Sequence, residues 1–155
     1  MILRFASEKD IPGMIKLLKQ VGQVHHQIRP DLFRAGAQKY DEAALSALLS
    51  DETRPILIAE IDSRVAGYAF CILQVTKDDP VLKDRRVLYI DDLCVEETRR
   101  GQGIATALYQ RTLEFARELN CDAVTLNVWC GNDSAMKFYE KSGFRPQKVG
   151  MEVIL

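Results

Sequence analysis

Apolar positions recur along most of the chain, with the three-to-four-residue spacing of a helix or the alternating or continuous pattern of a strand. The pattern predicts helices at residues 11–21, 41–49 and 103–119, and a short one from 132 or 133 to 143. It predicts strands at residues 2–5, 55–61, 65–76, 86–95, 123–128, 144–149 and 151–155. The expected order, β-α-α-β-β-β-α-β-α-β-β, is typical of a mixed α/β layer structure.

Capping and turn residues mark the boundaries of these elements. The helix N-caps are expected at Ser7 or Asp10, at Asp41, and at Asn132 or Asp133. Gly143 is expected to end the last helix, because glycine accepts the left-handed conformation that follows many helices. Residues 62–64 have the composition of a hairpin turn, and residues 22–37 are the least regular part of the chain.

Composition and charge narrow the class of protein only a little. The 155 residues fit one domain, expected to span residues 1–155, and 47% hydrophobic with 28% charged residues is ordinary for a globular protein. The net charge of -1 gives no reason to expect nucleic acid or membrane binding. The four cysteines lack the spacing of metal ligands, so no metal site is expected. No apolar run has the length of a signal peptide or a membrane span, and we expect a cytoplasmic protein.

The most informative segment, residues 89–106, runs from a strand through carboxylates and a basic, glycine-rich turn into a helix. Gly101 and Gly103 lack a Cβ, so the backbone there can bend tightly and approach phosphate oxygens. The positive end of the following helix and the Arg100 guanidinium both favour an anion. The turn has neither the Gly-Lys-Ser/Thr of a Walker loop nor the third glycine of a dinucleotide fingerprint. The segment therefore predicts a site for a phosphorylated cofactor.

A second motif lies downstream, at residues 132–144, with the pattern Asn-x-x-Ala-x-x-Phe-Tyr-x-x-x-Gly-Phe. With the Arg-x-x-Gly-x-Ala pattern at residues 100–105, it makes the chain similar to the GNAT (Gcn5-related N-acetyltransferase) superfamily over nearly its whole length. The resemblance implies a GNAT-like mixed, mostly antiparallel central sheet of about seven strands, flanked by about four helices. It also implies acetyl-CoA as co-substrate and direct transfer of the acetyl group from the thioester to a primary amine.

The resemblance assigns the cofactor contacts to three groups of residues. The turn that binds the pyrophosphate corresponds to Arg100, Gly101, Gln102, Gly103, Ile104, Ala105 and Thr106. A bulged strand, whose backbone binds the pantetheine arm and polarises the thioester carbonyl, corresponds to Leu93, Cys94 and Val95. The start of the last helix contacts the cofactor through Asn132, Ser134 and Ala135, and Asn132 can also cap that helix.

Three residues are candidates for proton transfer. Tyr139 matches the family tyrosine that protonates the departing thiolate, and the alternative is that it packs in the core like Phe138. Asp91 or Asp92 can take the proton of the attacking ammonium, directly or through water. Adjacent strand residues point to opposite faces of a sheet, so only one of the two is expected to reach the site. An acidic pair in a similar strand of polyamine acetyltransferases favours Asp91.

The acceptor side of the site is expected around residues 23–33. His25 and His26 there are either a proton relay or packing residues, and Trp129 either lines the acceptor channel or fills the core. The acceptor is an amine-bearing small molecule or a protein amine, and the resemblance implies a homodimer. Two other functions stay open: a non-catalytic acyl-CoA-binding or sensing module, and a nucleotide-binding protein that uses the same glycine turn.

Overall fold

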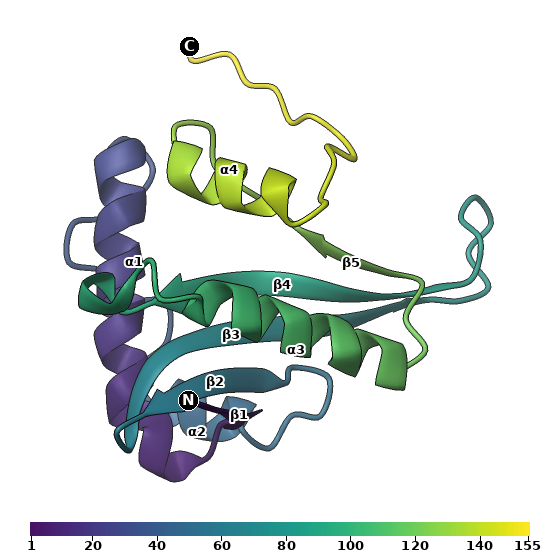
Figure 1. Cartoon of the computed structure of the whole chain (residues 1–155). Coiled ribbons are helices and arrows are strands. Elements are labelled where there is room, and N and C mark those ends of the chain that lie inside the picture. Colours follow the sequence, from purple (N-terminus) through teal and green to yellow (C-terminus); the bar gives the residue numbers. More distant parts are fainter.

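Five strands form one sheet in the order β1-β2-β3-β4-β5 (Figure 1). The computed structural model describes all 155 residues. The strands are β1 (Ile2–Phe5), β2 (Ile56–Ile61), β3 (Arg64–Thr76), β4 (Arg85–Val95) and β5 (Ala123–Leu126). Neighbouring strands are antiparallel except β4 and β5, which run parallel. The prediction of a mixed, mostly antiparallel α/β fold is confirmed, with five strands instead of about seven.

Helices cover both faces of this sheet, because the strands alternate side chains between two apolar cores. The helices are α1 (Ile11–Ile28), α2 (Glu42–Leu48), α3 (Ile104–Glu118) and α4 (Asp133–Lys141). Helices α1 and α2 pack against the face that carries Tyr68 and Phe70 of β3. Helix α3 packs against the opposite face, which carries Ala69 and Cys71 of the same strand.

Helix α1 is longer than its apolar pattern predicts. It continues through residues 22–28, so the prediction of an irregular segment there is wrong, and His25 and His26 lie in the last turns of the helix. The helix continues through Gly22. The missing side chain of this residue lets the following loop approach the helix. A Cβ at Gly22 would lie 2.3 Å from the carbonyl oxygen of Ala37. The glycine therefore serves close packing of residues 29–41 against α1.

The two strands predicted at residues 144–149 and 151–155 are absent, and this part of the prediction is wrong. The segment runs past α4 as an extended tail (Figure 1). Its apolar side chains at Val149, Met151 and Val153 are almost fully exposed. Alternation of apolar and polar residues favours a strand only where an edge is available for pairing, and here the tail pairs with no strand.

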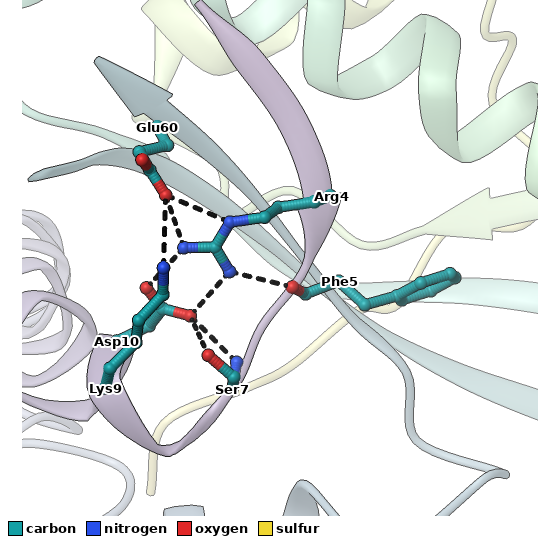
Figure 2. Close-up of polar contacts among 6 residues, drawn as sticks. All are labelled: Arg4, Phe5, Ser7, Lys9, Asp10 and Glu60. Atoms are coloured by element: carbon teal, nitrogen blue, oxygen red, sulfur yellow. Dashed lines mark hydrogen bonds and ion pairs between the residues drawn. The ribbon is translucent and has the colours of Figure 1, made fainter. Parts of the chain in front are cut away.

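A partly buried ion network joins β1, the start of α1 and β2 (Figure 2). The Arg4 guanidinium donates to both carboxylate oxygens of Asp10 at 2.8 Å, and its Nε donates to Glu60 at 3.0 Å. Burial raises the pKa of Asp10, but the hydrogen bonds from Arg4 and Ser7 outweigh burial and leave the pKa below its ordinary value. The network is structural, and it fixes the point at which α1 begins.

Candidate active site

The sheet opens between β4 and β5, at the end of β4 that leads to the glycine turn. The two strands pair only from Val87–Ile90 to Ala123–Leu126, whereas β4 continues to Val95 without a partner on that side. Beyond the last pair, the chain leaves β5 toward α4, and Figure 1 shows this divergence. The backbone of residues 91–95 therefore has β3 on one side and an opening in place of β5 on the other.

A β-bulge in β4 lies at the start of this opening. Phe70 of β3 pairs with Asp92 and Cys71 pairs with Ile90, which leaves Asp91 as an additional residue in β4. The bulge implied by the family resemblance at residues 93–95 thus lies at residues 91–92. The sequence carries a signal of it, because the buried positions Leu88 and Ile90 are followed by Leu93 and Val95, one residue out of phase.

The bulge places Asp91 and Asp92 on the same face of the sheet, so the prediction that they point to opposite faces is wrong. Asp92 accepts a hydrogen bond of 2.7 Å from the hydroxyl of Tyr68, on the α1 face. Asp91 contacts Lys39 and the hydroxyl of Tyr40, and the Tyr40 ring stacks on Phe70, also on the α1 face. An extra residue breaks the strict alternation of side chains that the prediction assumed.

Asp92 is the carboxylate with the perturbed proton affinity. Burial raises the pKa of Asp92 to about 6, against the opposing effects of the Tyr68 hydrogen bond and the Lys39 charge, and the neighbouring Asp91 charge adds to the rise. Tyr68 is completely buried, and Asp92 is the partner that satisfies its hydroxyl. The group can change its charge near neutral pH.

Asp91 is held by an ammonium group. The Lys39 Nζ lies 2.6 Å from Asp91 Oδ2, and the hydroxyl of Tyr40 is 3.4 Å from the same oxygen. The side chain of Asp91 is only 14% exposed, whereas that of Lys39 is 48% exposed. Burial lowers the pKa of Lys39, but the hydrogen bond and charge of Asp91 outweigh it and raise the pKa overall. Lys39 therefore keeps its positive charge at neutral pH.

Tyr139 of α4 lies close enough to Asp92 for the charge of that carboxylate to act on it. Its ring packs between Phe138 and Phe144, with centroids 5.2 and 5.5 Å away, and the residue is 9% exposed. The hydroxyl makes no hydrogen bond within the protein. Burial and the nearby negative charge of Asp92 raise the pKa of Tyr139. The phenol therefore keeps its proton at neutral pH and is free to donate it.

Cys94 contributes a thiol to this cluster, but burial raises its pKa to about 12. At neutral pH the group is a thiol and a poor nucleophile. Beside it, the Gln20 amide of α1 donates to the carbonyl of Val95 at 2.9 Å and accepts from the N–H of Glu97 at 3.0 Å. Gln20 thus fixes the chain where β4 ends and the turn begins.

The glycine turn has the backbone that an anion site requires. Gly101 and Gly103 have φ angles of 77° and 78°, and a Cβ at either residue would have no protein atom within 4 Å. Gly103 precedes the first residue of α3 and supplies no side-chain cap, so the first N–H groups of the helix are free. The exposed Arg100 adds positive charge at this point. The predicted residues therefore fit a phosphate group.

Of the remaining residues predicted to bind the cofactor, some have exposed side chains and others have buried ones. Gln102 and Thr106 are exposed at the turn and in the first turn of α3, whereas the side chain of Ile104 is buried in the core and offers only its backbone. At α4, Asn132 Oδ1 accepts from the N–H of Ala135 at 3.3 Å, which confirms Asn132 as the cap. Ser134 is exposed beside it.

Aromatic side chains join the end of α1 to the chain between β5 and α4. Phe33 packs against His25 at 5.0 Å and against Trp129 at 5.2 Å, measured between ring centroids. Trp129 is 42% exposed, so it does not fill the core. Burial, followed by the charge of Lys39, lowers the pKa of His25. This aromatic group lies on the predicted acceptor side.

Sequence reasoning missed four residues of the site: Gln20, Lys39, Tyr40 and Tyr68. Lys39 and Asp91 are 52 residues apart, and Tyr68 and Asp92 are 24 residues apart. No local sequence pattern predicts contacts between residues so far apart in the chain. The tyrosine in an otherwise apolar strand was the one available signal, because a buried hydroxyl usually has a hydrogen-bond partner.

No helix of the structure combines the length and the apolar character that crossing a bilayer requires. Over residues 22–144 the chain matches the Acetyltransferase (GNAT) family. N-acetyltransferase 8B of Homo sapiens is 34% identical over 115 residues, which cover 69% of this chain and 49% of that protein. The uncharacterized N-acetyltransferase MJ1530 of Methanocaldococcus jannaschii is 28% identical over 151 residues, 96% of this chain and 81% of that protein.

Among solved structures, a mutant of the BH1408 protein from Bacillus halodurans has a TM-score of 0.95 and 32% identity, with 100% of this chain and 99% of that chain covered. The open, bulged sheet, the glycine turn and these similarities agree: the chain belongs to the acetyltransferase (GNAT) family. It spans about half the length of the human relative.

Proposed function

We propose that this protein is an acetyl-CoA-dependent N-acetyltransferase that moves the acetyl group directly to a primary amine. One observation carries the proposal: the β4 bulge turns Asp91 and Asp92 to one face, and Tyr139 of α4 is buried close enough to Asp92 to feel its charge. Two carboxylates and a protonated phenol supply the base and the acid that amine acylation needs.

Acetyl-CoA fits the groups around the opening and supplies the activated acetyl group as a thioester. The free N–H groups at the start of α3, the left-handed glycines and Arg100 are suited to its phosphates. At Leu93, Cys94 and Val95 the side of β4 away from β3 has no partner strand, and its backbone is suited to the pantetheine arm and thioester carbonyl. Asn132, Ser134 and Ala135 lie at the start of α4, and we assign them to the same arm.

Proton transfer is assigned to three side chains. Asp91 binds the acceptor ammonium and takes its proton, and the support for this choice is that the ammonium of Lys39 binds there. Tyr139 gives its proton to the departing thiolate. Burial and, after it, the charge of Asp92 raise the pKa of Tyr139, which keeps the phenol protonated until the thiolate forms. Asp92 is the alternative base, because its pKa of about 6 suits proton uptake near neutral pH.

The test begins with calorimetric titration of the protein with acetyl-CoA, CoA and ADP. Binding of acetyl-CoA, followed by release of free thiol in the presence of a panel of amines, supports the enzyme. The panel contains polyamines, amino sugars, amino acids and lysine peptides, since the acceptor class is a proposal of the same kind. Binding without thiol release for any amine would instead support a non-catalytic acyl-CoA-binding module. No binding of any of the three ligands would contradict both functions.

A further inference from the structure

Lys39 places a primary ammonium where the proposed reaction needs one. The loop of residues 29–41 brings its Nζ to 2.6 Å from Asp91 Oδ2, at the β4 bulge. The charge of Asp92 also reaches this ammonium, and the Lys39 charge in turn acts on Asp92. An unbranched alkyl amine is therefore already bound to Asp91, with the charge of Asp92 close by.

A second lysine–carboxylate pair of the protein provides a comparison. Lys16 of α1 pairs with Glu96, which follows the end of β4. Its side chain is 71% exposed, against 48% for Lys39. Lys16 pairs with neither Asp91 nor Asp92. If exposure alone determined modification by a reactive thioester, Lys16 would react before Lys39.

We propose that the protein acetylates its own Lys39, and this proposal rests on the acetyltransferase function proposed above. A C–N bond forms between the Lys39 Nζ and the acetyl carbon, and the C–S bond of the thioester breaks. Asp91 takes the first proton that the ammonium loses, and Tyr139 protonates the sulfur of CoA. The second proton, which the nitrogen loses as the amide forms, returns through solvent to the Tyr139 phenolate. The products are Nζ-acetyl-lysine at position 39 and free CoA.

The modification has a consequence for the acceptor site. Acetylated lysine carries no charge and cannot form the ion pair with Asp91. Asp91 then becomes available to the ammonium of a second, external acceptor. The same geometry points to the acceptor class: a primary amine at the end of an unbranched alkyl chain, as in a polyamine or a lysine side chain.

The test uses the full chain, with Lys39 shown by mass spectrometry to be unmodified at the start. The protein is incubated with acetyl-CoA, and the occupancy of Lys39 and Lys16 is followed by peptide mapping. We expect acetylation of Lys39 well ahead of Lys16, with a rate constant independent of protein concentration. Tyr139→Phe is expected to slow modification of Lys39 about 100-fold and to leave Lys16 unchanged. Lys39→Arg keeps a cation beside Asp91, and we expect no acetylation at position 39 in this variant.

Equal occupancy of Lys39 and Lys16, with no effect of Tyr139→Phe, would show simple chemical acetylation and overturn the proposal. A rate that rises in proportion to protein concentration would also overturn it, because transfer between copies would then be responsible. The same samples are titrated with acetyl-CoA and assayed with the amine panel. Turnover of an external amine while Lys39 stays unmodified would contradict self-acetylation alone, whereas absence of acetyl-CoA binding would contradict the proposed function as well.

Discussion

Asp91 and Asp92 are neighbours in β4, yet their carboxylates lie on the same face of the sheet, one bound to Lys39 and the other to Tyr68. The bulge at this point gives the two groups different surroundings. The ammonium of Lys39 neutralises Asp91, whereas burial makes Asp92 hard to ionise. Two carboxylates of one type thus acquire different properties, which is a common arrangement where acid and base roles are divided.

Replacing Tyr139 by Phe should lower kcat about 100- to 10,000-fold, because a general acid contributes on that order. The dissociation constant for acetyl-CoA should stay unchanged, since the hydroxyl makes no hydrogen bond within the protein. Steady-state kinetics and calorimetry test the two parts. Tyr109→Phe is the matched control: it removes a hydrogen bond of 3.0 Å to the carbonyl of Ser142. That variant should lose about 0.5–1.5 kcal/mol of stability and keep kcat. Equal kcat for Tyr139→Phe and the unmutated protein would exclude Tyr139 as the acid.

Asp92 should make the protein less stable as pH rises through its titration range. Its pKa is raised from 3.8 to about 6 in the folded state. Between these values the folded state holds more protons than the unfolded state, so the free energy of unfolding falls as pH rises. Asp92→Asn should remove this loss. Above pH 6 its free energy of unfolding should exceed that of the unmutated protein by up to about 3 kcal/mol.

Urea unfolding at pH values from 4 to 8 measures this difference. Tyr68→Phe is the companion variant, because loss of its hydrogen bond removes an effect that lowers the pKa of Asp92. The pH range over which stability falls should then extend to higher pH. A stability difference between Asp92→Asn and the unmutated protein that does not change with pH would contradict the assignment.

Gly103→Ala should weaken acetyl-CoA binding at least about tenfold, equivalent to about 1.4 kcal/mol. The left-handed conformation at this residue, with φ of 78°, is strained for alanine by about 1–2 kcal/mol. Gly36→Ala is the matched control, since Gly36 has φ of 68° and equally open surroundings outside the turn. Both variants should lose similar stability, and only Gly103→Ala should lose affinity. Equal affinities in calorimetry would exclude the turn as the phosphate site.

Lys39→Met should lower KM for a cationic amine and change kcat less, because Asp91 then lacks its internal ammonium. The unfolding free energy should change by no more than about 1 kcal/mol, as for other half-exposed ion pairs. Lys16→Met removes the cation that pairs with Glu96 and should leave KM unchanged. A higher KM in Lys39→Met would mean that the lysine helps to bind the acceptor instead of occupying its place.

The homodimer expected from the sequence stays a prediction, and the exposed tail offers a direct test of it. Val149, Met151 and Val153 alternate with other residues along the tail, a pattern suited to pairing with a strand of a second copy. Deletion of residues 148–155 should then convert a dimer into a monomer in light scattering. An unchanged dimer would locate the interface elsewhere, and a monomer before deletion would contradict the homodimer.

Local patterns in the sequence determined the elements and the cofactor side of the site. The glycine turn, the N-cap Asn132 and the C-terminal Gly143 of α4 are each specified by residues within one or two helical turns. Such features depend on backbone conformation and on neighbouring hydrogen-bonding groups, so they can be predicted without knowledge of the fold. The four helices and the first strands followed from periodicity for the same reason.

Only the tertiary structure decided which side chains meet at the acceptor side. The β4 bulge turned Asp91 to the face of Asp92, and the loop after α1 brought Lys39 to it across 52 positions of sequence. The tail shows the converse case: its strand-like pattern stayed unpaired because no strand edge lies against it. Pairing between distant segments depends on which surfaces the core places side by side, and burial then sets the charge of a group such as Asp92. The sequence by itself therefore determined a member of this fold with a glycine turn suited to a phosphate. The packing of distant segments decided how its carboxylates are arranged.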